Sequence, residues 1–203
     1  MKSDFWDQRF GSDAYAYGVA PNTFLAETLP ALVPLPADVI ELGAGEGRNA
    51  VFFAEQGYRV TALDYSRAGI EKTQRLAASR GVAVETIHAD VLRWRPERRW
   101  DAVLLSFLHL PPPARPALYR KIREILAPGG ALVAEWFRPE QITEGHKSGG
   151  PPRLEMMVTE EELRAHFPEA GIRRLESVTR TLDEGAHHAG SAAVVRLVWQ
   201  APE

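Results

Sequence analysis

Residues 39–49 read Val-Ile-Glu-Leu-Gly-Ala-Gly-Glu-Gly-Arg-Asn, and this stretch decides the fold class of the 203-residue chain. The apolar run at its start predicts a buried strand, which three glycines at alternate positions, Gly43, Gly45 and Gly47, connect to a helix. Glycines allow backbone angles that are closed to other residues, and they let a ligand approach the main chain. A strand, a glycine-rich turn and a helix in this order are typical of open α/β sheets, which bind ligands at the carboxyl ends of their strands.

The spacing of these glycines distinguishes two kinds of nucleotide site. The dinucleotide fingerprint G-x-G-x-x-G would place its third glycine where Arg48 stands, whereas Gly47 comes one residue earlier. Glu41 precedes the first glycine by two residues, and a carboxylate there would repel the negative charge of a pyrophosphate. The pattern therefore favours a ligand with a cationic amino or sulfonium group, and an NAD-dependent oxidoreductase is the alternative.

Strand and helix patterns continue to alternate on the C-terminal side, which predicts a mostly parallel sheet. We expect strands at 38–42, 59–63, 84–88, 101–106 and 131–137. We expect helices at 48–56, 66–80 and 115–126. The last two strands, 172–182 and 192–200, have no room between them for a crossover helix, so we expect an antiparallel hairpin at or near one sheet edge.

Two segments lie outside this alternation. Residues 1–36 are interrupted by prolines and are interpreted as a cover segment, with a short helix at 22–32 that Asn22 caps. Residues 138–157 are rich in glycine and proline, and we expect an irregular, mobile loop over a site. A short helix follows, with Thr159 as its N-cap.

The composition narrows the classes of function. The length suits one domain, and the net charge of -3 without a long basic run gives weak support for binding nucleic acid. The chain has no cysteine, so disulfides, thiolate nucleophiles and cysteine metal sites are excluded. It also has no apolar run near the ~20 residues of a membrane span, nor the apolar start of a signal peptide. We expect a cytoplasmic protein, and the sequence leaves its oligomeric state open.

Acidic residues follow the second and third predicted strands. Asp64 ends the second strand, where a carboxylate can accept hydrogen bonds from both ribose hydroxyls of a nucleoside. Asp90 follows the third strand and can accept from an adenine amino group, while Tyr65 and Val91 are placed to sandwich the ring. Because the carboxyl ends of parallel strands meet at one edge, these residues predict an adenosine site beside the glycine-rich turn.

These stretches together resemble the class I S-adenosylmethionine (SAM)-dependent methyltransferases. Glu41-Leu-Gly-Ala-Gly-Glu-Gly47 looks like the first motif of that superfamily, and Leu126-Ala-Pro-Gly-Gly130 looks like its usual approach to the fifth strand. The resemblance implies a Rossmann-like, seven-stranded sheet with the last strand antiparallel, one methyltransferase domain over 1–203 with 37–203 as its core, and SAM as cofactor. The cofactor-binding residues predicted in this way are Arg9, Tyr17, Glu41, Gly43, Ala44, Gly45, Asn49, Asp64, Tyr65, Ala89, Asp90, Val91, Ser106 and Phe107.

A narrower resemblance is to bacterial tellurite-resistance and thiopurine-methyltransferase-like proteins. The matching stretches are Phe5-Trp-Asp-Gln-Arg9, Tyr17-Gly-Val-Ala-Pro-Asn22, Ser106-Phe-Leu-His-Leu-Pro-Pro112 and Glu184-Gly-Ala-His-His-Ala-Gly190. This resemblance implies a small-molecule acceptor such as a thiol or a chalcogen oxyanion. A protein of the same fold that binds SAM without turnover is the further alternative.

Methyl transfer depends mainly on in-line positioning, so few acid–base residues are expected. Three histidines are candidates for contact with the acceptor: His109 after the fourth strand, and His187 and His188 in the hairpin loop. Arg9 and Tyr17 are predicted to hold the methionine carboxylate of the cofactor, because a bidentate arginine suits that group. We expect no metal, since adjacent histidines rarely point the same way.

Overall fold

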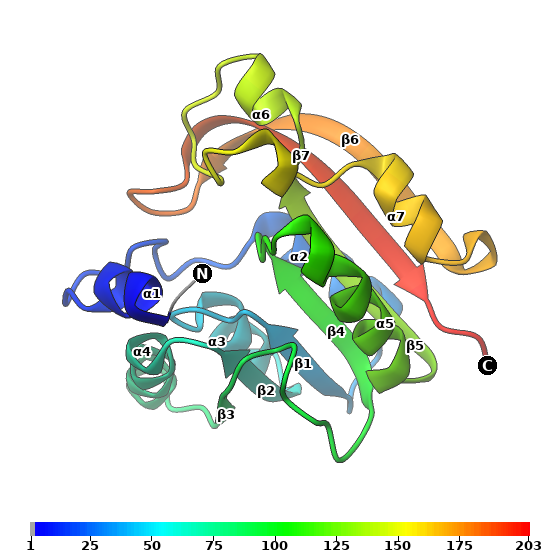
Figure 1. The fold of residues 1–203 in the computed structure, drawn as a ribbon. Coiled ribbons are helices and arrows are strands. Elements are labelled where there is room, and N and C mark those ends of the chain that lie inside the picture. The colour runs from blue at the N-terminus through cyan, green and yellow to red at the C-terminus, as the bar shows by residue number, and fades with distance from the viewer. Residues whose placement is uncertain (1–2) are drawn as a thin grey trace.

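The computed structural model describes residues 3–203, with side chains from Phe5 onward, and is built on one seven-stranded sheet (Figure 1). Met1 and Lys2, which begin the predicted cover segment, lie outside the described residues. The sheet order is β3-β2-β1-β4-β5-β7-β6, in which β7 pairs antiparallel with β5 and β6 and the other pairs are parallel. The predicted sheet and its edge hairpin are confirmed. The strands are β1 (Asp38–Leu42), β2 (Arg59–Asp64), β3 (Glu85–His88), β4 (Trp100–Ser106), β5 (Leu126–Phe137), β6 (Ile172–Asp183) and β7 (Ala189–Gln200).

Three helices begin where the sequence predicts a cap. The side chains of Asn22, Ser66 and Thr159 each accept a hydrogen bond from a backbone N–H in the first turn of α2, α4 and α7, as predicted. The α-helices are α1 (Ser3–Phe10), α2 (Thr23–Leu32), α3 (Arg48–Glu55), α4 (Arg67–Ser79), α5 (Arg115–Ile125), α6 (Glu140–Thr143) and α7 (Glu160–His166). Three single turns of 3₁₀-helix lie at Pro112–Ala114, Leu154–Met156 and Glu169–Gly171.

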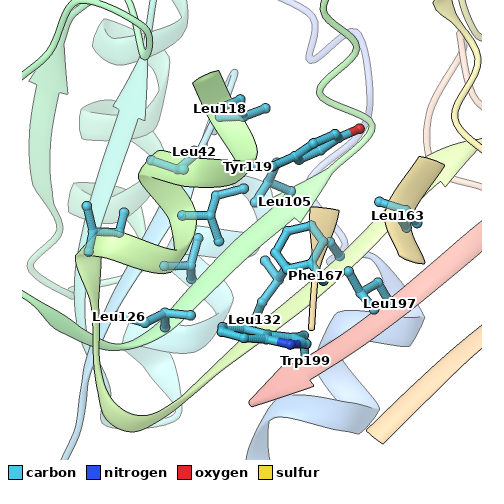
Figure 2. Packing of buried hydrophobic residues seen from close by; sticks show 14 of the residues in the cluster. Leu42, Leu105, Leu118, Tyr119, Leu126, Leu132, Leu163, Phe167, Leu197 and Trp199 are labelled. Atoms are coloured by element: carbon cyan, nitrogen blue, oxygen red, sulfur yellow. The ribbon is translucent and has the colours of Figure 1, made fainter. Parts of the chain in front are cut away.

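The two faces of the sheet bury separate hydrophobic clusters. Figure 2 shows the larger one, in which α5 and α7 cover side chains such as Leu105, Leu132 and Trp199. The smaller one packs α2 and α3 against the opposite face, through alternate strand residues such as Leu104 and Val133. This alternation follows from the two-residue period of a strand. Both faces of the central strands are therefore covered, and their carboxyl ends remain available for ligands.

Two predicted loops contain more regular secondary structure than expected. The hairpin loop is shorter than 183–191, because β6 and β7 stay paired until Asp183 meets Ala189. The segment 138–157 contains α6 and a 3₁₀ turn, and its Gln141 side chain is buried. That amide donates to the carbonyl of Gly149 and accepts from the N–H of Ala193 on β7, which ties the segment to the sheet.

Within residues 3–203, no helix has the length and apolar content needed to cross a bilayer.

Candidate functional site

The glycine-rich turn between β1 and α3 has a backbone that side chains would obstruct. Gly43, Gly45 and Gly47 all have positive φ angles, of 73°, 57° and 87°. A Cβ atom at Gly47 would lie 2.6 Å from the side chain of Thr73 on α4, so the turn and that helix require glycine for their close approach. Gly43 and Gly45 are half-exposed and leave backbone accessible at the tip of β1.

Glu41 takes a different place from the predicted one. Its carboxylate is buried and accepts hydrogen bonds from the Asn49 side chain at 2.6 Å and the Ala50 N–H at 3.1 Å. Burial raises the pKa of Glu41 to about 7, although the hydrogen bond from Asn49 opposes that rise. Odd and even residues of β1 point to opposite faces, and position 41 points at the start of α3. A contact between Glu41 and a cationic ligand stays a prediction.

Asp64 links the tips of β1 and β2. Its two carboxylate oxygens accept from the N–H groups of Gly45 and Ser66, each at 2.7 Å. Burial raises the pKa of Asp64 above its ordinary value, and these hydrogen bonds oppose the shift. Asp90 lies beyond β3, which pairs with β2 up to the Asp64–His88 pair, and a third of its side chain is exposed. The structure therefore gathers the turn and both aspartates at the same end of three adjacent strands.

The remaining predicted nucleoside contacts differ in exposure. Tyr65 is exposed beside Asp64, and Ala89 and Ser106 are half-buried at the same end of the sheet. Val91 is buried in the larger hydrophobic cluster, and Ala44 packs in the smaller one. The proposed sandwich of an adenine ring between Tyr65 and Val91 stays a prediction.

The segment between α1 and α2 is fixed over the glycine-rich turn. The buried ammonium of Lys72 lies 2.7 Å from the Glu46 carboxylate and donates to the carbonyl of Ala14 at 2.6 Å. Glu46 also accepts from the N–H of Tyr17 at 3.4 Å. Burial raises the pKa of the Tyr17 hydroxyl, and the neighbouring Arg9 opposes that rise. Arg9 and Tyr17 are thus brought together as predicted, and their hold on a carboxylate stays a prediction.

Four rings from separate parts of the chain meet beyond the turn, and we call Tyr17, Phe107, Phe137 and His188 the aromatic cluster. The His188 ring centre lies 4.5 Å from that of Tyr17 and 4.6 Å from that of Phe107, and Phe107 stacks on Phe137 at 4.5 Å. Phe107 has a φ of 58°, which is a strained conformation for a bulky residue. Such strained conformations are found mainly at functional sites. The cluster therefore marks a second candidate region, next to the turn.

His109 is not available for the predicted contact with an acceptor. Its ring is buried, Nδ1 lies 2.9 Å from the carbonyl oxygen of Met156, and Nε2 accepts from the N–H of Phe137 at 3.1 Å. Nδ1 therefore carries the proton, and both ring nitrogens are engaged. Burial lowers the pKa of His109 to about 4. The expectation of a catalytic His109 is corrected to a structural role, in which the imidazole joins the end of β5 to the 3₁₀ turn before α7.

This environment predicts a stability contribution that depends on pH. The pKa of His109 is lower in the folded protein, about 4, than its ordinary 6.5, so the unfolded chain takes up a proton first on acidification. The folded state then loses stability from pH 6.5 down to about 4, by about 2 kcal/mol at pH 5. In urea unfolding, the stability advantage of the native sequence over His109→Asn should shrink by that amount between pH 7 and pH 5. The contribution of Glu41 to the pH dependence is the same in both proteins and cancels in the difference. Equal pH dependence of the two proteins would contradict the prediction.

The two hairpin histidines differ in burial. His187 is exposed, its ring centre lies 5.8 Å from that of Tyr17, and its backbone N–H donates to the carbonyl of Ala16 at 3.4 Å. His188 is buried in the aromatic cluster, with Nδ1 3.8 Å from a carboxylate oxygen of Glu184. Of the two, His188 is the more deeply packed in the aromatic cluster, and a contact of either ring with an acceptor stays a prediction. In the part of the chain that the structure describes, no three His, Asp or Glu side chains are grouped as metal ligands.

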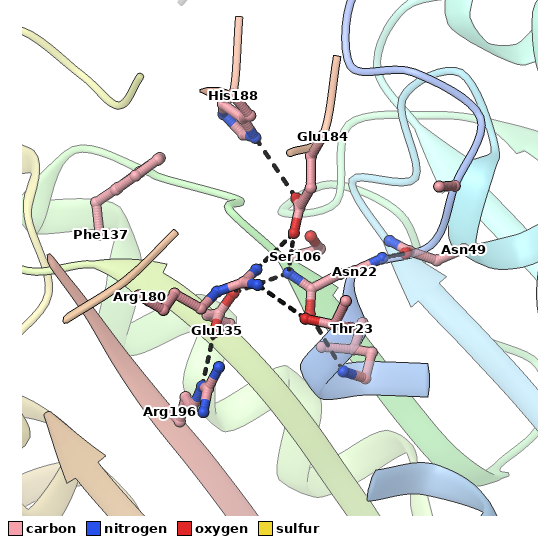
Figure 3. A network of polar contacts seen from close by, with 12 residues as sticks. Asn22, Thr23, Asn49, Ser106, Glu135, Phe137, Arg180, Glu184, His188 and Arg196 are labelled. Atoms are coloured by element: carbon pink, nitrogen blue, oxygen red, sulfur yellow. Dashed lines mark hydrogen bonds and ion pairs between the residues drawn. The ribbon is translucent and has the colours of Figure 1, made fainter. Parts of the chain in front are cut away.

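A buried network of charges lies beneath the aromatic cluster (Figure 3). It begins with a row of polar residues in register across four strands, Ser106, Glu135, Arg196 and Glu176. Glu135 is fully buried and accepts from Arg196 at 2.7 Å, and from Arg180 and Asn22 at 2.8 Å.

Glu184 connects this network to the glycine-rich turn. Its carboxylate lies 2.6 Å from the Arg48 guanidinium and 2.5 Å from that of Arg180. Arg48 is the first residue of α3, and it also donates to the Ser106 hydroxyl at 3.2 Å. The position that distinguishes this turn from a dinucleotide fingerprint thus holds an arginine that reaches the hairpin.

Most of this network was not predicted from the sequence. A signal was present, because Glu135 interrupts the apolar run Leu132-Val-Ala-Glu-Trp-Phe137 and Arg196 interrupts Val194-Val-Arg-Leu-Val198. A charged residue inside a buried strand is costly unless it is paired. Two such interruptions in strands that pair with each other favour a cross-strand ion pair.

Comparison with known proteins agrees with this geometry. Residues 39–130 match the family model described as a methyltransferase domain. The chain is 27% identical over 124 residues to probable thiol methyltransferase 2 of Arabidopsis thaliana, covering 59% of this chain and 52% of that protein. It is 30% identical over 162 residues to the cypemycin N-terminal methyltransferase of Streptomyces sp, covering 78% of this chain and 60% of that protein. The chain thus spans between half and three fifths of the length of these curated relatives.

The fold has solved counterparts. TehB from Haemophilus influenzae superposes with a TM-score of 0.72, covering 98% of this chain and 66% of that chain, at 15% identity. The fold is that of a doubly wound α/β protein, with the glycine-rich turn and two aspartates gathered at the tips of β1, β2 and β3. Residues 39–130 therefore resemble a methyltransferase domain, and the fold of the chain is shared with SAM-dependent methyltransferases of known structure. This likeness favours SAM over the dinucleotide of the NAD-dependent alternative.

Proposed function

We propose that this protein transfers the methyl group of SAM to a small, soft nucleophile such as a thiol or a chalcogen oxyanion. The observation that carries the proposal is the gathering of the glycine-rich turn, Asp64 and Asp90 at one end of three adjacent strands. In this proposal residues 1–36 cover the site of a single methyltransferase unit over 1–203.

The residues at these strand tips fit SAM. Gly43 and Gly45 are half-exposed and leave their backbone open to a ligand, and aspartate oxygens retain lone pairs for ribose hydroxyls and an adenine amino group. Arg9, beside Tyr17, supplies a guanidinium for the methionine carboxylate. Bound SAM supplies an electrophilic methyl group, and its sulfur keeps the electron pair of the broken carbon–sulfur bond.

The aromatic cluster supports a soft acceptor. Aromatic walls exclude water around a polarisable atom such as sulfur. Below them, the guanidinium groups of Arg48, Arg180 and Arg196 are balanced by the carboxylates of Glu135, Glu176 and Glu184. The thiol methyltransferase among the relatives accords with that chemistry.

A panel of acceptors tests the proposal. The purified protein is incubated with SAM and, in separate reactions, a small thiol, selenite or tellurite, and both S-adenosylhomocysteine and the methylated product are measured by mass spectrometry. We expect product with at least one acceptor. Calorimetric binding of S-adenosylhomocysteine without product from any acceptor would favour a binding protein without turnover, and no binding at all would overturn the cofactor assignment.

A further inference from the structure

Glu184 and His188 are held at the two ends of the loop between β6 and β7. The N–H of Glu184 donates to the carbonyl of His188 at 2.8 Å, and the N–H of His188 donates to the carbonyl of Gly185 at 3.2 Å. Gly185 packs so closely on the segment before α2 that a Cβ there would lie 2.3 Å from the backbone nitrogen of Gly18. The loop therefore sets the position of the two side chains relative to each other.

The Glu184 carboxylate is kept ionised. Burial alone would raise its pKa, but the nearby His188 ring and the charges and hydrogen bonds of Arg48 and Arg180 together lower the pKa of Glu184 to about 2. Arg48 lies 2.6 Å away on one carboxylate oxygen and Arg180 lies 2.5 Å away on the other. At any pH near neutrality, a negative charge therefore faces the His188 ring.

That charge selects one form of the imidazole. His188 Nδ1 is buried, has no hydrogen-bond partner and lies 3.8 Å from Glu184 Oε2 (Figure 3). A carboxylate attracts an N–H and repels a ring lone pair, so the proton belongs on Nδ1 and the lone pair on Nε2. The edge that carries Nε2 faces Gly149, where a Cβ would lie 3.1 Å from that nitrogen.

We propose that Glu184 is a positioning residue that fixes His188 in its Nδ1–H form, so that Nε2 can take the proton of an acceptor that arrives protonated. In that step the S–H bond of a thiol breaks, its electron pair stays on sulfur, and the proton bonds to Nε2 to give an imidazolium that water later deprotonates. The inference rests on the proposed function, because only a protonated acceptor needs such a group.

The surroundings of His188 keep it ready for this role. Burial lowers its pKa below the ordinary value, and the charge of Arg48 lowers it further, while Glu184 opposes both effects. The imidazole is therefore neutral at pH 7. The ionisable groups that face it, from the hairpin, β6, α3, the segment before α2 and the loop after β4, are Glu184, His187, Arg180, Arg48, Tyr17 and His109.

Nitrogen NMR of ¹⁵N-histidine-labelled protein tests the inference without an acceptor. Long-range proton–nitrogen spectra distinguish protonated from unprotonated ring nitrogens, and His188 is assigned by backbone connectivity in the native sequence. We expect Nδ1–H to be the dominant form. In Glu184→Gln it should become the minor form, and the pKa of His188 should fall, whereas His187→Asn, the matched neighbour, should leave Nδ1–H dominant and should not lower that pKa.

The measurement on the native sequence stands even if Glu184→Gln does not fold. A dominant Nε2–H form in the native protein would overturn the inference, as would an unchanged tautomer in folded Glu184→Gln. Calorimetry with S-adenosylhomocysteine on the same samples separates this result from the proposed function. Binding with the wrong tautomer would refute only the role of Glu184, and the right tautomer without binding would refute the methyltransferase proposal.

Discussion

Replacing Asp64 by Asn should weaken the binding of S-adenosylhomocysteine about 100-fold. The proposed contacts are two hydrogen bonds from ribose hydroxyls to an ionised carboxylate, each contributing about 1.5 kcal/mol, and about 1.4 kcal/mol corresponds to a factor of ten. Asn keeps the shape of the side chain and one acceptor oxygen, but it places an amide N–H₂ against the N–H of Gly45 or Ser66. Isothermal titration calorimetry measures the change directly.

The matched control for this variant is Glu97→Gln. Glu97 is exposed in the segment before β4, at the opposite end of the sheet. The substitution therefore removes the same charge without changing a residue at the strand tips. Its affinity should equal that of the native sequence, and urea unfolding should show that both variants remain folded. Unchanged affinity in folded Asp64→Asn would mean that no ribose lies at the tip of β2.

Replacing Glu135 by Gln should destabilise the protein by about 3–5 kcal/mol, a large part of the stability of a typical domain. Glu135 is fully buried and neutralises Arg180 and Arg196, while its oxygen also accepts from Asn22, the cap of α2. Removing one partner of a buried ion pair leaves charges uncompensated, which costs more than the pair itself contributes. Urea unfolding at pH 7 measures the loss.

Glu176→Gln provides the comparison within the same network. Glu176 lies 3.6 Å from Arg196 on the other side, but 31% of its side chain is exposed, so solvent screens the interaction. We expect a loss below about 1 kcal/mol. If the two variants unfold at the same urea concentration, burial of Glu135 does not govern the energy of the network.

Much of the fold was readable from local pattern. The strand at 38–42 was predicted with the bounds that β1 has, and Asn22, Ser66 and Thr159 cap helices as expected. These features depend on neighbours within a few residues, so the sequence carries them directly. By contrast, α1 was not predicted. It packs beside α4, where the carboxylate of Asp7 accepts a hydrogen bond from the Ser66 hydroxyl, and such contacts between distant residues depend on the tertiary structure.

The sequence predicted which residues gather at the candidate site, but only part of its geometry. The sequence determined that glycines, Asp64 and Asp90 would meet at one edge, because parallel strands place their carboxyl ends together. It did not determine the direction or the partners of the side chains there. Glu41 turns toward α3, and His109 bonds to Phe137 and to a carbonyl 47 residues away.

What the sequence by itself determined is therefore the class of fold, the order of its elements and the edge at which the glycine-rich turn and the two aspartates meet, since these follow from periodicity and glycine spacing. Only the tertiary structure decided which histidine lies at the site. It buries Arg48 from α3 against Glu184 from the hairpin, 136 residues apart in the chain. Charges this far apart meet only when the sheet is complete, and the low polarity of the interior then makes their pairing obligatory.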